Sequence, residues 1–393
     1  MRIKYIYSDY YQYIMNPLEF HKQAKGKIEV IVRTPIRSQE DLRLAYTPGV
    51  AEPCLEIAKN KELAYVYTRK HNMVAVVTDG SAVLGLGNIG PEASLPVMEG
   101  KCVLFKEFAD VDAFPIALDT QDVDEIVETV VRIAPMFGGI NLEDISAPRC
   151  FEVERKLQER LSIPVFHDDQ HGTAIVALAG LINACKVVGK EIKNVMVVIN
   201  GVGAAGVAIT NLLLHIGVKD IVLIDSQGII CSARTELSTE KQELLAKTNR
   251  KNICGTLEDA MKGADVFIGV SKPGVLTESM VRTMGEKPII FAMANPVPEI
   301  MPDLAYAAGA VIVATGRSDF PNQINNVLAF PGIFRGLLDA RISKVTMDMK
   351  VAAAEAIANY VEHPTVENII PAPIDRGVAE VVAKTIARFA ILR

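Results

Sequence analysis

The sequence predicts an α/β protein of two domains, residues 1–170 and residues 171–393, the second of them doubly wound. The 393 residues are enough to build two hydrophobic cores. From about residue 72 onward, short apolar runs alternate with longer amphipathic runs, and a glycine-rich stretch at 201–206 separates one apolar run from a helix-like one. Alternation of this kind is typical of parallel sheets that are covered by helices.

The first domain contains short apolar runs that predict strands and amphipathic runs that predict helices between them. The predicted strands are 72–77, 114–118, 138–142 and 163–166, and the predicted helices are 121–134 and 148–161. Pro148 suits the start of the second helix, because a backbone N–H would have no partner there.

The second domain begins with a long helix-like run, 172–188, and then repeats the alternation. Its predicted strands are 194–199, 220–225, 264–270, 288–294 and 310–316, and its predicted helices are 204–216 and 257–262. Two further runs, 349–361 and 378–389, read as helices. We expect these last helices to pack back on the first domain.

Composition argues against several classes of function. The net charge is −6 and no run of Lys and Arg exceeds two residues, so we expect no nucleic-acid partner. The longest apolar stretches are strand-length or interrupted, so we expect no membrane span. The six cysteines are scattered without a CxxC pair, which favours reduced thiols and a cytoplasmic location. Residues 1–14 carry five of the ten tyrosines but no signal-like apolar region. They are either an arm at a subunit interface or incidental to a domain that starts at Met15.

Two stretches match the pattern GxGxxG, one at 85–90 and one at 201–206. After the first come Pro91 and Pro96, and a proline in the second turn is expected to break the helix that a pyrophosphate would need. The first stretch is therefore not expected to bind a nucleotide.

The second stretch follows an apolar strand and precedes a helix without proline, as in a Rossmann-type dinucleotide site. Its residues Gly201, Val202, Gly203, Ala204, Ala205 and Gly206 are the predicted cofactor-binding loop. Gly201 allows the tight turn, Gly203 the close approach of the pyrophosphate, and Gly206 the packing of helix on strand.

Asp225 ends the next predicted strand, where an acidic residue accepts hydrogen bonds from the ribose hydroxyls. A carboxylate there favours NAD, since it repels a 2′-phosphate. Ser226, Ser232 and Arg234 lie close by in sequence and could offset that repulsion. The cofactor is therefore NAD or NADP.

Two pairs of carboxylates follow two predicted strands. Glu143 and Asp144 come just after 138–142, and Asp168 and Asp169 come just after 163–166. Carboxylates gathered at one sheet edge repel one another unless a cation lies among them, and oxygen ligands favour Mg²⁺ or Mn²⁺. The alternative is that Asp168 or Asp169 caps a helix beginning near Gly172, which explains only one of the four. A zinc site on His167 and His171 is disfavoured, because the two are not expected on one helix.

Eight stretches of the chain, in unbroken order, resemble the malic enzymes, and most closely the short form found in bacteria and archaea. They are AYTPGVAEPC (45–54), VTDGSAVLGLGNIGP (77–91), PVMEGKCVLFKEFADVDAFPI (96–116), GGINLEDISAP (138–148), PVFHDDQHGTA (164–174), INGVGAAG (199–206), FAMANPVPEI (291–300) and ATGRSDFPNQINNVLAFPGIFRG (314–336). The resemblance runs from about residue 17 to residue 393.

This resemblance implies oxidative decarboxylation of L-malate to pyruvate and CO₂, with reduction of NAD(P)⁺ and a requirement for Mg²⁺ or Mn²⁺. It implies metal ligation by Glu143, Asp144 and Asp169, with Asp168 beside the metal. Lys101 would be the general base and Tyr46 the general acid. Asn295 and Asn326 would hold substrate and nicotinamide, and Lys101 would also contact the substrate.

One departure concerns the substrate carboxylate. The larger animal-type malic enzymes carry an arginine in the VTDG loop, and here Ala82 stands in its place, as in short-form members. The carboxylate partner would then be Asn88, loop amides or a basic residue from elsewhere. The resemblance also implies at least a homodimer, which could bring residues of one chain to the other's site. Two alternatives stay open: malolactic conversion of malate to lactate, and a non-catalytic nucleotide sensor.

Overall fold

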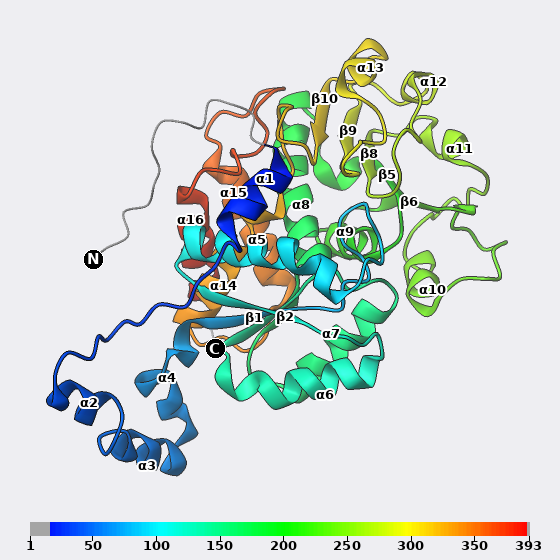
Figure 1. The fold of residues 1–393 in the computed structure, drawn as a ribbon. Helices are drawn as coiled ribbons and strands as arrows, with labels where there is room; N and C mark the ends of the chain where they lie inside the picture. The colour runs from blue at the N-terminus through cyan, green and yellow to red at the C-terminus, as the bar shows by residue number, and fades with distance from the viewer. Residues whose placement is uncertain (1–15, 391–393) are drawn as a thin grey trace.

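The computed structural model describes residues 16–390 and consists of two parallel sheets with helices around them (Figure 1). The tyrosine-rich residues 1–14 lie outside the described range. The first sheet has the order β2-β1-β3-β4. Its strands are β1 (Met73–Thr78), β2 (Asp112–Ala117), β3 (Gly139–Leu142) and β4 (Val165–His167). All are parallel, as predicted.

The helices of the first sheet are α5 (Pro91–Ala109), α6 (Val123–Ile133) and α7 (Arg149–Arg160). The helix α6 begins where the Asp122 side chain accepts hydrogen bonds from the next turn. The helix α5 runs straight through Pro96, so the expected break is wrong. Pro96 removes one backbone hydrogen bond, and the burial of Met98 and Phe105 on the same helix outweighs that loss.

The second sheet has the order β10-β9-β8-β5-β6-β7. Its strands are β5 (Met196–Asn200), β6 (Asp220–Asp225), β7 (Gly228–Ile229), β8 (Val266–Gly269), β9 (Ile289–Ala292) and β10 (Ile312–Thr315). The helices along it are α9 (Ala204–His215), α10 (Thr239–Leu245), α11 (Leu257–Met261), α12 (Glu278–Val281) and α13 (Pro302–Ala307). The order reverses beside β5, which confirms a doubly wound sheet; only the short β7 pairs antiparallel.

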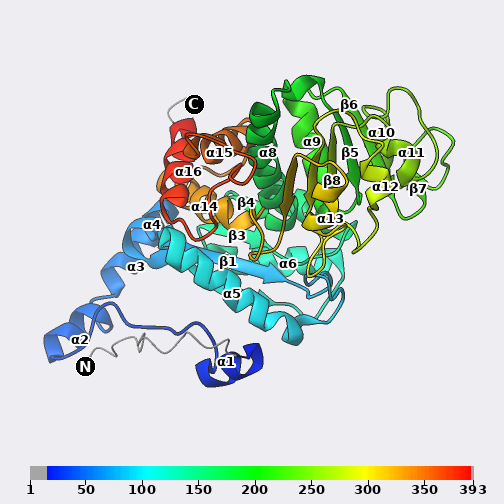
Figure 2. The same ribbon diagram turned by 90° about the horizontal axis from the view of Figure 1, so that it is seen from above.

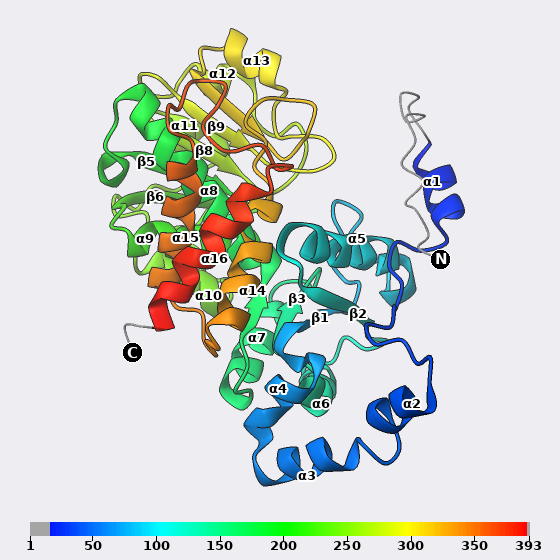
Figure 3. The same ribbon diagram turned by 90° about the vertical axis from the view of Figure 1, so that its left-hand side faces the viewer.

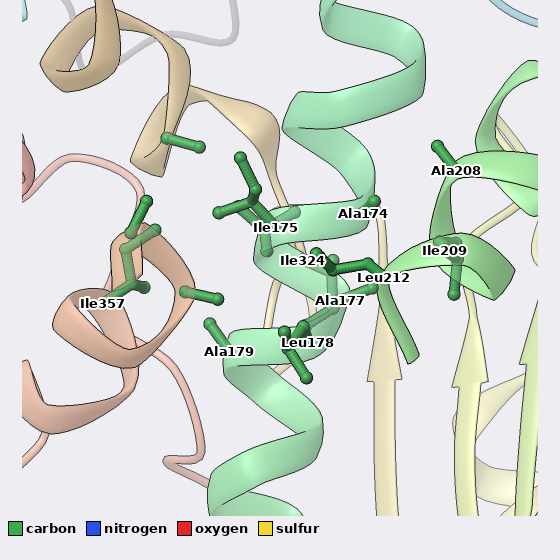
Figure 4. Packing of buried hydrophobic residues seen from close by; sticks show 14 of the residues in the cluster. Ala174, Ile175, Ala177, Leu178, Ala179, Ala208, Ile209, Leu212, Ile324 and Ile357 are labelled. Atoms are coloured by element: carbon green, nitrogen blue, oxygen red, sulfur yellow. The ribbon is translucent and has the colours of Figure 1, made fainter. Parts of the chain in front are cut away.

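The helix α8 (Asp168–Val188) joins the two sheets and forms much of the core. Figure 4 shows Ala174, Ala177 and Leu178 of this helix among the buried side chains of α9, with Ile357 on the far side. Among the described residues, α8 is the one helix long and apolar enough to cross a membrane, but 72% of its most apolar window is buried inside the protein. Packing against neighbouring helices therefore accounts for its composition.

The last helices are α14 (Phe330–Asp339), α15 (Met347–Tyr360) and α16 (Gly377–Ala387). The helix α15 packs on α8, α16 packs on α14 and α15, and α14 reaches α5 of the first sheet (Figure 2). The Phe105 ring of α5 lies 4.7 Å from the Phe330 ring and 5.3 Å from the Phe334 ring. Edge-on aromatic contacts therefore fix α14 over the first sheet.

Most of the segment 16–72 projects away from both sheets (Figures 1 and 3). It contacts the rest of the chain where the Lys27 N–H donates to Glu99 of α5, where Glu62 pairs with Arg341, and where Arg69 pairs with Asp112 of β2. It contains α1 (Pro17–Ala24), α2 (Gln39–Ala45), α3 (Ala51–Lys59) and α4 (Ala64–Tyr67). We call residues 16–67 of this segment the arm. No apolar side chain of the arm joins a buried cluster, and Val30, Ile31 and Val32 are 84%, 72% and 82% exposed. Such a concentration of exposed apolar side chains marks an interaction surface.

The expectation of six reduced cysteines is wrong for one pair, since Cys231 and Cys254 form a disulfide. The fold brings them together across 23 residues, because Ile229 of β7 donates a backbone hydrogen bond to Gly255. The other four cysteines are free thiols, and three of them are buried.

Candidate active site

The four predicted carboxylates meet at one edge of the first sheet. Glu143 and Asp144 follow β3, while Asp168 and Asp169 open α8 directly after β4. Because β3 and β4 are hydrogen-bonded parallel neighbours, the residues after both strands lie together. The Asp144 N–H donates to Asp169 Oδ2 over 2.7 Å. One oxygen from each of Glu143, Asp144 and Asp169 lies within 4.8 Å of the other two.

The helix-cap alternative is wrong. The helix α8 begins at Asp168, four residues before the expected start near Gly172, and its N-cap is His167, with no side-chain cap bond. The zinc alternative is not supported either. The His171 ring bonds Glu154 (2.9 Å) through Nε2 and Lys350 (2.9 Å) through Nδ1, so both ring nitrogens are engaged away from the cluster.

The protein balances the charges of this cluster only in part, because among the described residues the four carboxylates pair with one ammonium, that of Lys101. Burial raises the pKa of Asp144 to about 9, with Asp169 and Glu143 adding to the effect. Burial also raises the pKa of Glu143 and of Asp168 to about 7, and that of Asp169 to about 6. Among the described residues, Asp144 Oδ2 is buried without a hydrogen-bond partner. An oxygen-only set with surplus negative charge fits a hard divalent cation such as Mg²⁺ or Mn²⁺.

Lys101 reaches this cluster from α5. Its Nζ lies 2.6 Å from Asp168 Oδ2 and 2.9 Å from Glu143 Oε1, and the side chain is buried beneath Phe330, whose ring centroid is 4.3 Å from Nζ. Burial by itself lowers the pKa of Lys101, but the charges of Asp168 and Glu143 outweigh it and hold that pKa above its ordinary value. The geometry thus brings a lysine and the carboxylate cluster together.

Asn326 and Asn295 lie at different places around the site. The Asn326 side chain donates to Asp168 Oδ2 over 2.6 Å, so it orients the same carboxylate that bonds Lys101. Asn295 follows β9 on the second sheet and meets the first glycine-rich loop: a Cβ on Gly85 would lie 2.4 Å from the Asn295 carbonyl oxygen. This contact brings a loop of the first sheet against the carboxyl end of the second.

The second glycine-rich loop has the geometry expected of a nucleotide loop. Gly201 has a φ of 110°, and a Cβ on Gly206 would lie only 1.8 Å from the Gly201 oxygen, which requires glycine at both positions. A Cβ on Gly203 would meet nothing within 4 Å. Gly203 is the N-cap of α9, so its open surroundings lie where a pyrophosphate would approach the free N–H groups of that helix.

Asp225 ends β6 as predicted, but its carboxylate is already bonded. Arg234 binds it with both terminal nitrogens, and Lys241 Nζ lies 2.7 Å away. Although burial opposes the effect, these partners lower the pKa of Asp225 to about 2. The sequence pointed to Arg234 but not to Lys241, which lies 16 residues downstream on α10.

Tyr46 is not brought to the site by its own chain. It is the C-cap residue of α2, it is 65% exposed, and its side chain forms no hydrogen bond within the described residues. Figure 3 shows α2 well away from α5, the helix of Lys101.

Two groups near the site were missed by sequence reasoning. Asp79, just after β1, is buried and bonds Arg149 Nη2 over 3.1 Å. Glu154 of α7 is buried and accepts from His171 and from the His167 N–H. The burial of Glu154 could have been predicted from the sequence, because it lies on the apolar face of its helix, one position after Val153 and three before Leu157.

Comparison with known proteins gives one consistent family. The family described as malic enzyme, N-terminal domain, matches residues 25–158, and the malic enzyme NAD binding domain matches residues 170–391. The bifunctional malic/malolactic enzyme of Bacillus subtilis is 58% identical over 95% of this chain and 92% of its own. The NADP-dependent malic enzyme of Halomonas elongata is 48% identical over 95% of this chain and 92% of its own. The crystal structure of the NAD-dependent malic enzyme of Thermotoga maritima superposes with a TM-score of 0.92 at 50% identity, over 95% of this chain and 99% of that one. The chain therefore belongs to the malic enzyme family.

Proposed function

We propose that this protein oxidatively decarboxylates L-malate to pyruvate and CO₂ and passes the hydride to NAD(P)⁺. One observation carries the proposal: the Lys101 ammonium lies between Asp168 and Glu143, beside three carboxylates whose oxygens converge within 4.8 Å. A base next to a divalent-cation site is what oxidation of an α-hydroxy acid followed by decarboxylation requires. Membership of the malic enzyme family supports the same reaction.

We assign Glu143, Asp144 and Asp169 to hold the cation, with Asp168 beside it. When bound, a divalent cation would polarise the C2 oxygen of malate and stabilise the charge that develops as CO₂ leaves. Lys101 in its neutral form takes the proton of the C2 hydroxyl as hydride leaves C2 for the nicotinamide. Because Asp168 and Glu143 favour its charged form, Lys101 becomes a base only when positive charge at the site offsets them.

The roles of the two asparagines and of the glycine-rich loop follow from their positions near the carboxyl ends of the strands. Asn326 keeps Asp168 in place through its 2.6 Å bond, and Asn295 lies at the junction of the two sheets, where substrate and nicotinamide would meet. The loop Gly201–Gly206 at the start of α9 holds the pyrophosphate.

The proton for C3 of the enolate requires an acid that the described chain does not place at its own Lys101. We propose that the working unit is a homodimer and that the arm of one copy carries Tyr46 to the site of the other. The support is the arm itself: most of its large apolar side chains are exposed, its α2 and α3 contain no buried residue, and its Tyr46 side chain has no hydrogen-bond partner within the described residues. A second copy related by two-fold symmetry would cover both arms at once.

Malolactic conversion is the second candidate, because the 58% identical Bacillus subtilis relative is named as a bifunctional malic/malolactic enzyme. The same base, metal ligands and nucleotide loop would serve both reactions. They differ in whether the reduced nucleotide leaves the site or passes its hydride to pyruvate.

The test is absorbance at 340 nm with purified protein, L-malate and Mn²⁺, run separately with NAD⁺ and NADP⁺, followed by assays of pyruvate and lactate. Reduced nucleotide equal to pyruvate supports the proposal. Lactate without net nucleotide reduction would assign malolactic chemistry instead. Nucleotide binding with neither product would indicate a sensor.

A further inference from the structure

The carboxyl end of β6 carries a group of charges that an NAD-only site does not need. Asp225 accepts hydrogen bonds from Arg234 Nη1 (3.0 Å), Arg234 Nη2 (3.2 Å), Lys241 Nζ (2.7 Å) and the Gln227 N–H (2.9 Å). A carboxylate offers about four lone-pair sites. All of them are occupied, so Asp225 has no capacity left for the ribose hydroxyls that an acidic residue usually binds here.

The location of this group is that of the adenosine ribose. The strand β6 pairs directly with β5, and β5 leads into the loop Gly201–Gly206. In sheets of this topology, the end of the strand beside the glycine-rich loop faces the ribose, and a nearby arginine accommodates a 2′-phosphate where one is present.

The sum of charges favours an anion. Arg234 and Lys241 carry two positive charges and Asp225 one negative, so the three side chains leave a surplus of one positive charge. The Arg234 and Lys241 side chains keep 18% and 26% of their surface exposed, whereas Asp225 keeps 9%. The two cations are therefore more accessible than the carboxylate beneath them. A planar guanidinium with an ammonium beside it suits a phosphate group.

We propose that Arg234 and Lys241 bind the 2′-phosphate of NADP⁺, and that Asp225 is a positioning residue that holds these two side chains in place. The inference rests on the proposed function, in which a nicotinamide dinucleotide accepts the hydride from malate. The 2′-phosphate accepts hydrogen bonds from the N–H groups of Arg234 and Lys241 that Asp225 leaves unused, since an arginine carries five N–H donors and a lysine three. The enzyme then uses NADP⁺ at least as well as NAD⁺.

The experiment titrates NADPH and NADH into the full-length protein without malate, following nucleotide fluorescence. The variants are Arg234→Met and Lys241→Met. Lys251→Met is the matched control, because Lys251 pairs with Asp220 over 3.7 Å at the opposite end of the same strand. The wild type should bind NADPH at least as tightly as NADH. Each of the two variants should weaken NADPH about 10- to 100-fold and change NADH by less than about threefold, while the control changes neither. Retained NADH binding also shows that the variants are folded.

Asp225→Asn separates this proposal from the usual role of the acidic residue. If Asp225 only positions the two cations, NADH affinity changes by less than about threefold. If Asp225→Asn weakens NADH tenfold or more while Arg234→Met leaves NADPH unchanged, Asp225 binds the ribose and the proposal is wrong. Binding is measured without turnover, so an enzyme that failed to oxidise malate would contradict the proposed function and leave this inference intact.

Discussion

Lys101 is held by two carboxylates that oppose the role we propose for it. Burial favours its neutral form, but Asp168 at 2.6 Å and Glu143 at 2.9 Å favour the ammonium. The balance between these effects depends on the charge at the neighbouring carboxylates, so base strength and cation binding are coupled. This coupling explains why a lysine can serve as a base in an acidic site.

Lys101→Arg should lower kcat about 10²- to 10⁴-fold and leave nucleotide affinity unchanged. Arginine keeps the positive charge beside Asp168 but does not give up its proton. Steady-state rates at saturating malate and Mn²⁺ measure the effect. Lys106→Arg, on the exposed side of the same helix, is the control and should leave kcat unchanged. A Lys101→Arg enzyme within tenfold of wild type would exclude Lys101 as the base.

Asp144 provides a test that depends on pH. Its pKa is raised to about 9 by burial and by Asp169 and Glu143, whereas an unfolded aspartate titrates near 4. The metal-free folded chain therefore binds this proton more tightly than the unfolded chain, and stability falls as the pH rises from about 4 to about 9. Asp144→Asn removes that loss.

In the presence of a chelator, Asp144→Asn should melt at a higher temperature than wild type, by a margin that is larger at pH 8 than at pH 6. Thermal unfolding at the two pH values measures this margin. Asp119→Asn, an exposed carboxylate after β2, should show no such trend. A margin that is equal at both pH values would mean that Asp144 is not forced to carry an uncompensated charge.

Sequence reasoning found the carboxylate cluster because its signal is local. Glu143 and Asp144 after one predicted strand, and Asp168 and Asp169 after another, define a shared edge once the strands are parallel. Lys101 and Tyr46 had no such signal and came only from resemblance to the family. The predicted set of partners of Asp225 lacked Lys241, because no sequence pattern indicates that α10 brings Lys241 next to the end of β6.

At the scale of the elements, the loop between β5 and α9 makes different demands on its glycines. A side chain on Gly206 collides with the Gly201 carbonyl, whereas one on Gly203 enters open space. Gly206 is thus required by packing, and Gly203 is left to serve a ligand.

Gly206→Ala should lower the melting temperature and weaken nucleotide binding together, because α9 must move away from β5. Gly203→Ala should leave the melting temperature within about a degree and weaken nucleotide binding alone, as its φ of −94° suits alanine. Thermal unfolding and NADH titration of both variants separate the two effects. Equal loss of stability in both would contradict the distinction.

The disulfide between Cys231 and Cys254 ties β7 to the segment before α11. Denatured protein that has not been reduced should show four reactive thiols, and six after reduction. Reduction should destabilise the second sheet region by about 2–4 kcal/mol, as for other closed loops of this size. Six thiols before reduction would show that the pair is not bonded.

The predicted ends of helices and strands agree with the structure where the hydrophobic periodicity is strong. They differ from it where tertiary packing decides the end of an element. The strands and the amphipathic helix α6 were predicted to within a few residues. The helix α8 starts at Asp168, earlier than expected. The Asp168 and Asp169 carboxylates accept hydrogen bonds from Lys101 and from the Asp144 N–H rather than capping the helix. The break expected at Pro96 does not occur, because the free energy gained by burying the apolar face of α5 exceeds the cost of one lost backbone hydrogen bond.

At the scale of the whole molecule, the arm and the site are two incomplete halves. The site has a base, metal-type carboxylates and a nucleotide loop, while the arm has Tyr46 and unpartnered apolar side chains. Within the described residues, the site lacks a general acid and the arm lacks a surface that covers its apolar side chains. The sequence alone could not show that the arm projects away from the two sheets. We propose that a second copy supplies what each half lacks.

The most direct measurement mixes two inactive variants, Tyr46→Phe and Lys101→Arg, after unfolding and refolding them together. If Tyr46 of one copy serves Lys101 of the other, each mixed dimer contains one intact site. Random pairing makes half of the dimers mixed, so about a quarter of wild-type malate oxidation should return. If the mixture remains as inactive as its components, Tyr46 and Lys101 do not act across two chains, and the proposed catalytic centre shared by two copies is wrong.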